Sequence, residues 1–223
     1  MTHTMALVHT VGEVVPTFKA LCAEIVPDVA CFHVLDEGII RTFSPEGEIT
    51  PRTVRRLAEV VSRAEDDGAD LILVTCSTIS PTVDLVAPQV GVPVLKIDQP
   101  MADLAVTTGQ RIGVLATAKS AMTPVKNLVK GRAKAAHRSV EMHTLFLEGA
   151  MQSLQSGDAA SHDRRVIQGI KELARWAEVV VLAQGSMASA LDDWPQAEWP
   201  CPILTNARLG LERASEMLKT AAG

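Results

Sequence analysis

Short apolar runs alternate along the chain with longer stretches in which apolar residues recur at helical spacing. Eight of the runs indicate strands, at residues 5–9, 29–35, 71–75, 92–97, 111–116, 140–146, 178–183 and 201–205. Strands that alternate with helices are typical of parallel sheets with crossover helices. We therefore expect an α/β fold.

Helix signals are clearest in three of the intervening stretches. Residues 50–70 begin with Thr50 as an N-cap and Pro51 in the first turn, and Gly68 stops the pattern before the next strand. Residues 163–178 repeat this design, with Trp176 expected on the buried face, and residues 206–223 predict a closing helix. No Gly/Ser-rich or low-complexity tract divides the chain.

Two pairs of strand ends indicate an internal duplication. The stretches 68–84 and 176–192 share a strand, a small turn, a hydroxyl and a helix start when Cys76 is aligned with Gly185, 109 residues further on. The runs 6–10 and 113–117 match at a separation of 107 residues. The alternative is that any two strand–helix units look alike. The duplication predicts two pseudo-symmetric lobes, each a mostly parallel sheet flanked by helices.

The duplication also predicts where the lobes begin and end. Residues 1–98 plus 205–223 would form the first lobe, which carries Cys76, and residues 99–204 the second, which carries Gly185. Strand ends from both lobes would line a cleft between them. Because ligands of open α/β sheets bind beyond the carboxyl ends of the strands, we expect the active site there.

Composition excludes several classes of protein. Of the 223 residues 47% are hydrophobic, the formal charge is -5, only 3% are aromatic and Tyr is absent. Nucleic-acid binding is not expected, because there is no basic stripe and little to stack on bases. No apolar run is long enough to span a membrane and the first ten residues do not resemble a signal peptide, so we expect a cytoplasmic protein.

The cysteines predict neither a metal site nor a redox pair. Cys22, Cys31, Cys76 and Cys201 show no CxxC spacing and no paired histidines. In a reducing compartment they should be free thiols, and all but Cys76 lie in apolar contexts where cysteines usually pack. We expect no cofactor and no metal.

Hydroxyl and small side chains follow four of the predicted strands, where they could hold a carboxylate without Arg. A single Ser or Thr at such a place usually only caps a helix, so the prediction rests on convergence of the four segments. The residues expected to bind substrate are Thr10, Ser77, Thr78, Thr117, Gly185 and Ser186.

Cys76 is the candidate catalytic residue. It follows the buried run 71–74 and precedes Ser77 and Thr78, so it should lie at the turn that starts a helix. The positive end of a helix dipole favours the thiolate, which can act as base or nucleophile. A cysteine inside the strand would be inert.

Three segments carry a resemblance to a known family. The sequences VTCSTIS, PVLKIDQPMADLAVTTGQRIGVLATAKSA and VVLAQGSMA, with FHVLDEGII at 32–40, resemble the aspartate/glutamate/hydantoin racemase superfamily over most of the chain. The resemblance implies two α/β lobes, no cofactor or metal, a small carboxylate substrate and a homodimer. It also implies two cysteines, one per lobe, acting on opposite faces of the carbon next to a carboxylate.

The sequence departs from that pattern at one point. The first cysteine of the family falls at Cys76, but the second falls at Gly185, which has no side chain to carry a proton. His9, His33 and Gln184 are candidates for a replacement by type or position, although an amide cannot transfer protons. Alternatively, a single thiol suffices, as in arylmalonate decarboxylase, a relative that keeps one cysteine in its second lobe.

The predicted function is that of a cofactor-independent racemase or isomerase acting at the carbon α to a carboxylate through Cys76. Alternatives are an arylmalonate-type decarboxylase with Cys76 as proton donor, covalent attack on an alkene as in maleate isomerase, and a carboxylate-binding protein without activity. An ammonium-binding carboxylate could not be assigned among Asp36, Glu37 and Asp98.

Overall fold

A computed structural model describes residues 3–43 and 48–221 of the chain. By its contacts the chain divides into unit 1, Met1–Asp98 with Ala207–Gly223, and unit 2, Gln99–Asn206. The sequence-based division placed the second boundary two residues earlier, at 204/205. Residues 1–2, 44–47 and 222–223 of the predicted first lobe lie outside the described residues.

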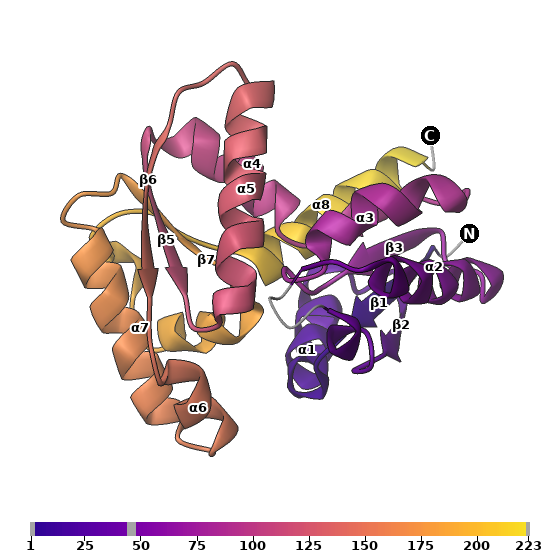
Figure 1. The fold of residues 1–223 in the computed structure, drawn as a ribbon, viewed down its shortest axis with the longest axis horizontal. Helices are drawn as coiled ribbons and strands as arrows, with labels where there is room; N and C mark the ends of the chain where they lie inside the picture. Colours follow the sequence, from indigo (N-terminus) through magenta and orange to yellow (C-terminus); the bar gives the residue numbers. More distant parts are fainter. Residues whose placement is uncertain (1–2, 44–47, 222–223) are drawn as a thin grey trace. The chain divides into compact units, whose positions relative to one another are not determined.

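Unit 1 contains four parallel strands in the order β2-β1-β3-β4, here called sheet A (Figure 1). Its strands are β1 (Thr4–His9), β2 (Ala30–Leu35), β3 (Leu71–Val74) and β4 (Val94–Lys96). Its helices are η1 (Gly12–Val14), α1 (Val15–Ile25), η2 (Ile40–Thr42), α2 (Pro51–Asp66), α3 (Ser80–Val86), η3 (Ala87–Gln89) and α8 (Asn206–Ala221).

Unit 2 repeats this topology as sheet B, in the order β6-β5-β7-β8. Its strands are β5 (Arg111–Ala116), β6 (Glu141–Phe146), β7 (Val179–Leu182) and β8 (Ile203–Thr205). Its helices are α4 (Gln99–Thr108), α5 (Lys119–Ala135), α6 (Ala150–Gln155), α7 (Ala159–Leu173), η4 (Gly185–Leu191) and η5 (Gln196–Glu198). All eight predicted strands are confirmed within two residues, and so are the α/β class and the paired lobes of like topology.

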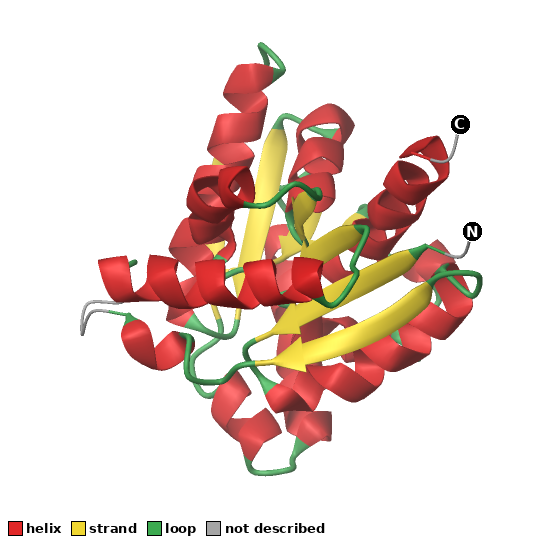
Figure 2. Cartoon of the chain, turned by 90° about the vertical axis from the view of Figure 1, so that its right-hand side faces the viewer, coloured by secondary structure: helices red, strands yellow, loops and turns green. Residues whose placement is uncertain are grey.

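Alternation along the strands of sheet A sends side chains to two separate apolar layers. Met5 and Leu7 of β1 pack with α1 and α8, whereas Ala6 and Val8 pack with α2 and α3. Because a parallel sheet is covered by helices on both faces, its strands are apolar throughout. Figure 2 shows the strands with helices on either side of them.

Helix α2 begins as the sequence predicts. The Thr50 hydroxyl accepts from the Thr53 backbone N–H, the Thr53 hydroxyl accepts from the Thr50 N–H, and Pro51 occupies the first turn. Gly68 follows the helix with a φ of 89°, a left-handed conformation that suits glycine.

Helix α7 departs from its predicted range of 163–178. It begins at Ala159, because the Asp158 carboxylate accepts from the Ser161 N–H and caps the helix four residues early. It ends at Leu173, so Trp176 lies beyond it, half-buried and stacked on His143 with 3.6 Å between ring centroids. Its predicted place on a buried helix face is therefore wrong.

Helices α4 and α8 are exchanged between the units. α4 follows β4 of sheet A but packs on α5, β7 and β8 in unit 2, while α8 follows β8 of sheet B but packs in unit 1. Gly210 of α8 passes so close to Ile97 that an added Cβ would lie 2.9 Å from the Ile97 carbonyl oxygen. Nowhere among the described residues is a helix both long and apolar enough to cross a membrane.

Candidate active site

In unit 1 the neighbouring strands β1 and β3 deliver Thr10 and Cys76 to one edge of sheet A. The strands run parallel, with Val8 paired to Val74, so the segments after them leave the sheet side by side. Thr10 is buried, and its Oγ1 has no hydrogen-bond partner among the described residues. A buried hydroxyl without a partner is a candidate ligand-binding group, because a hydrogen bond to a polar ligand atom would offset the cost of its desolvation.

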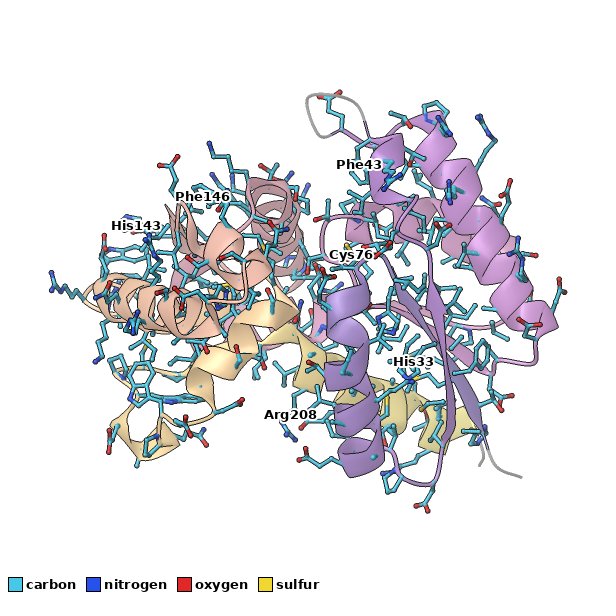
Figure 3. The ribbon with its side chains drawn as sticks, turned by 90° about the horizontal axis from the view of Figure 1, so that it is seen from below. His33, Phe43, Cys76, His143, Phe146 and Arg208 are labelled. Atoms are coloured by element: carbon cyan, nitrogen blue, oxygen red, sulfur yellow. The ribbon has the colours of Figure 1, made fainter. Side chains whose placement is uncertain are left out.

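Cys76 is half-buried, two residues beyond the end of β3 (Figure 3). It precedes a turn that leads into a helix, as predicted, but it does not lie at the helix N-terminus, because the turn occupies residues 77–79 and α3 begins only at Ser80. The thiol packs against the apolar layer that contains Ile79 and Val83. The structure therefore keeps Cys76 partly accessible at the strand end without placing it on a helix terminus.

Ser77 supports the turn after Cys76. Its side chain is buried and hydrogen-bonds to the carboxyl of Asp98, which also accepts from the Ser80 hydroxyl at 2.6 Å. Burial raises the pKa of Asp98, against the opposing effect of the Ser80 and Ser77 hydroxyls. Thr78 is half-buried in the same turn. The Ser77 hydroxyl therefore already has a hydrogen-bond partner inside the protein. Asp98 has no exposed surface.

A chain of hydrogen bonds joins three residues on the other face of sheet A. The Thr75 hydroxyl donates to the Val8 carbonyl at 3.0 Å and contacts His9 Nδ1 at 2.8 Å, while His9 Nε2 lies 2.9 Å from His33 Nδ1. A hydroxyl has one proton, so Thr75 accepts from His9 Nδ1–H, and His9 Nε2 in turn accepts from His33 Nδ1–H. Burial, with a contribution from His33, lowers the pKa of His9 to about 4.

This chain of hydrogen bonds gives a structural role to His9 and His33, the two histidines that the sequence suggested as replacements for the second thiol. Both lie in unit 1 with Cys76, and both nitrogens of His9 are occupied. Neutral His9 therefore holds Thr75, the residue before Cys76, in place.

In unit 2 the corresponding strand ends carry Thr117 after β5 and Gln184 after β7. Gln184 Oε1 accepts from the backbone N–H groups of Thr117 at 2.9 Å and Ala118 at 3.3 Å, and its Nε2 donates to Thr117 Oγ1 at 3.0 Å. We call these contacts the Gln184 clamp. Thr117 is buried, and its hydroxyl is used inside the clamp.

Gly185 and Ser186 start the 3₁₀ helix η4 just after the clamp. A Cβ at Gly185 would lie 3.5 Å from Asn206 Oδ1, an ordinary contact, so the position does not require glycine. Ser186 Oγ is buried without a hydrogen-bond partner among the described residues. Like the Thr10 hydroxyl, it is buried and unsatisfied, although it lies in the first turn of η4 rather than directly after a strand.

Strand register shows which residue of unit 2 corresponds to Cys76. Val74 pairs with Val8 in sheet A, and Leu182 pairs with Leu115 in sheet B. In each unit, the residue that follows the last pair donates its backbone N–H to the carbonyl of the paired residue. Thr75 donates to Val8 in unit 1, and Ala183 donates to Leu115 in unit 2. The residue after that is Cys76 in unit 1 and Gln184 in unit 2. The register therefore matches Cys76 with Gln184, one residue before the Gly185 that the sequence alignment chose.

Asp36, a charged candidate from the sequence, and Lys119 both have partners within the protein. Asp36 forms a two-point ion pair with Arg56 at 2.7 Å for each contact, and the Arg56 hydrogen bonds hold the pKa of Asp36 below its usual range. Lys119 starts α5 and lies over the Phe146 ring, 5.2 Å from its centroid. Across the described part of the chain, no three His, Cys, Asp or Glu residues are grouped so that they could hold a metal ion.

Two features of these strand ends, the Gln184 clamp and the histidine chain, were not predicted from the sequence. The clamp required Gln184 and Thr117 to be neighbours, and the histidine chain required β2 to pair with β1. One signal was available, since His9 and Thr75 each directly follow a buried apolar run.

Comparison with known proteins identifies the family. The model of the Asp/Glu/hydantoin racemase family matches residues 13–214. Glutamate racemase isoform RacE1 from Bacillus anthracis has a similar structure, with a TM-score of 0.70 and 16% identity over 98% of this chain and 82% of that one. An aspartate racemase homologue from Pyrococcus horikoshii has a TM-score of 0.73 and 14% sequence identity, over 98% of this chain and 100% of that one.

Allantoin racemase from Klebsiella pneumoniae gives a TM-score of 0.72 at 14% identity, over 98% of this chain and 89% of that one. A search of curated sequences finds no match. At these identities the structures show the fold, and the match to the family model over most of the chain shows the membership. The chain belongs to the Asp/Glu/hydantoin racemase family.

Proposed function

We propose that this protein is a cofactor-independent enzyme that acts on the carbon α to a carboxylate, with Cys76 as its single thiol acid or base. The observation that carries the proposal is the unequal pair of strand ends. Cys76 is half-buried after β3, whereas the matching position after β7 holds Gln184 in a clamp. An amide transfers no proton at neutral pH, so Gln184 cannot replace the second thiol of a racemase.

The proposed chemistry begins with loss of the α-proton to the Cys76 thiolate. The C–H electron pair then delocalises into the carboxylate as an enediolate-like state, whose charge requires hydrogen-bond donors. The Thr10 hydroxyl is suited to this role because it is buried and unsatisfied. Thr78 and Ser186 remain predicted carboxylate contacts, as do Ser77, Thr117 and Gly185, although Ser77 and Thr117 would have to exchange internal partners.

A single acid or base returns the proton to the face from which it was taken. We therefore expect exchange of the α-proton with solvent to run faster than racemisation. In D₂O, the enzyme should deuterate the α-carbon while the enantiomeric excess of the substrate falls more slowly.

The test measures both quantities on one sample, by proton NMR for exchange and by chiral chromatography for configuration. Panels of free amino acids, hydantoins and substituted malonates cover the carboxylate and related substrates of the family. Cys76→Ala is the loss-of-function variant, and Cys201→Ala is the matched control because Cys201 lies in the apolar layer of unit 2. The proposal is wrong if the parent neither exchanges nor converts any substrate, or if Cys76→Ala keeps full activity.

One-sided chemistry also favours a second candidate, decarboxylation of a substituted malonate. Here the bond between the α-carbon and one carboxylate breaks, carbon dioxide leaves, and the Cys76 thiol protonates the remaining enediolate on one face. Release of carbon dioxide with a product of one configuration would support this candidate over racemisation. Tight carboxylate binding without exchange or turnover would instead identify a binding protein.

A further inference from the structure

A cavity of about 310 Å³ opens in unit 1 between α1 and the edge strand β2. Lys19 and Cys22 line it from α1, and Cys31 and His33 line it from β2, together with apolar residues of the connecting segment. None of the predicted site residues lines this cavity. It is therefore distinct from Cys76 itself, although its lining residue His33 also belongs to the hydrogen-bond chain that reaches Thr75.

Two cysteines meet in this cavity although the sequence gives no CxxC spacing. The side chains of Cys22 and Cys31 hydrogen-bond to each other. Cys22 belongs to the buried layer beneath α1, with 5% of its surface exposed, while Cys31 packs at the margin of that layer and is half-buried. Both cysteines line the cavity, and Cys31 is the more exposed of the two.

The hydrogen bond makes the two thiols chemically unequal. Donation from Cys22 lowers the pKa of Cys31, and the same bond together with burial raises the pKa of Cys22. The more exposed cysteine is therefore the one with more thiolate character. An accessible thiolate next to a resolving thiol is the arrangement found in cysteines that react with peroxides.

We propose that Cys22 and Cys31 form a dithiol that hydroperoxides oxidise to a disulfide, with Cys31 as the attacking residue and Cys22 as the resolving residue. The Cys31 thiolate attacks the outer oxygen of the hydroperoxide, the O–O bond breaks, and an alcohol or water leaves after taking up a proton. Cys31 is then a sulfenic acid. The Cys22 sulfur displaces its hydroxyl, water leaves, and the S–S bond forms; a dithiol reductant reverses the change.

The surroundings favour this chemistry over metal binding. Two sulfur ligands are available, but the described residues contain no third His, Cys, Asp or Glu grouped with them as a metal site requires. Only nine positions separate the cysteines in sequence, so the disulfide would close a short loop between α1 and β2. His33 is on β2, two residues after Cys31, and is labelled in Figure 3.

Trypsin provides a direct readout on the full-length chain. Cleavage after Lys19 and Arg41 releases residues 20–41, which contain both Cys22 and Cys31, whereas Cys76 and Cys201 fall in separate peptides, 64–96 and 176–208. The protein is treated with increasing hydrogen peroxide, alkylated with N-ethylmaleimide, digested without reductant and analysed by mass spectrometry.

The expected result is a 20–41 peptide that loses two hydrogens and takes up no N-ethylmaleimide. It should form at least about tenfold faster than Cys201 is oxidised, because burial raises the pKa of Cys201 and lowers its thiolate fraction. Dithiothreitol should restore double alkylation. The proposal is overturned if residues 20–41 remain doubly alkylated at a peroxide concentration that oxidises Cys201.

Two variants test which thiol attacks. In Cys22→Ala, a sulfenic-acid probe such as dimedone should label Cys31, whereas in Cys31→Ala the same probe should leave Cys22 unlabelled. Labelling of Cys22 but not Cys31 would contradict the assigned order. Because Cys22 is buried, each variant is first checked for native circular dichroism; if one unfolds, the parent peptide still decides whether the disulfide forms.

Discussion

The ends of β3 and β7 occupy equivalent places in two sheets of the same topology, yet they are equipped for different tasks. After β3 the chain offers a half-buried thiol, and after β1 an unsatisfied hydroxyl on Thr10. After β7 it offers Gln184, whose carboxamide oxygen occupies two backbone N–H groups at the end of β5. Such N–H groups could otherwise hold a substrate oxygen.

Two sheets of the same topology therefore differ at equivalent strand ends, because in unit 2 a side chain of the protein itself occupies the backbone N–H groups. The carboxamide oxygen of Gln184 stands in for an external acceptor, and its Nε2 uses the Thr117 hydroxyl as well. In the proposed mechanism the proton transfer is then carried by unit 1. Four predictions test this inequality.

The largest effect is expected at the thiol. Cys76→Ala should lower the rate of α-proton exchange about 10³-fold, the range for loss of a general acid or base. Gln184→Ala, its counterpart in unit 2, should change the rate less than about tenfold. Exchange rates by NMR decide the matter, and equal losses in the two variants would contradict the inequality.

The second prediction restores a thiol to unit 2. Gln184→Cys should raise racemisation about 10²-fold relative to the parent, because a second acid then becomes available. Gly185→Cys is the matched control, since a side chain there meets only ordinary contacts but lies one residue off the register. Chiral chromatography measures both. A larger gain in Gly185→Cys would favour the sequence alignment over the strand register.

The third prediction concerns acid stability, because unit 1 has the buried His9 where the register of unit 2 has Ala116. The folded-state pKa of His9, about 4, is below the unfolded value of 6.5, so the unfolded chain binds the proton more tightly. Stability is therefore full above pH 6.5 and is lost as the pH falls toward 4.

Between pH 7.5 and 5 the loss should be about 2 kcal/mol of unfolding free energy. Urea titrations at the two pH values measure it, and His9→Asn should flatten the difference. His143→Asn in unit 2 serves as a comparison variant, because His143 is exposed and stacks on the half-buried Trp176. A pH dependence that survives in His9→Asn would assign the effect to other groups.

The smallest effects separate the two threonines. Thr10→Val should raise KM about tenfold without loss of stability, because its hydroxyl has no internal partner to lose. Thr117→Val should instead cost about 1 kcal/mol of stability, since Gln184 Nε2 loses its acceptor. Steady-state kinetics and urea unfolding distinguish them; the reverse pattern would show that Thr117 contacts the substrate.

The fold could be predicted from the sequence because each strand is formed by a local run of apolar residues. Each of the eight strands coincides with such a run, and the Thr50–Pro51 pair marks the start of α2 by its own chemistry. The start of α7 was missed because Asp158 lies outside the apolar pattern and acts through a single capping hydrogen bond.

The site was less accessible because it depends on register and on contacts between elements. The separation between equivalent residues is 107 for Val8 and Leu115 but 108 for Val74 and Leu182, and a one-residue change of this kind is invisible to pattern matching. The pairing of Cys22 with Cys31 likewise depends on how α1 lies over β2. Residue types could be predicted, but their partners could not.

The exchange of α4 and α8 has a consequence for the order in which the protein folds. Unit 2 is one continuous segment, Gln99–Asn206, whereas unit 1 needs α8 to cover Leu95 and Ile97. During synthesis from the N-terminus, unit 2 can therefore complete its core while one face of sheet A is still covered by α1 alone. The half of the molecule that carries Cys76 is assembled last, by a helix more than 100 residues downstream of the sheet that it covers.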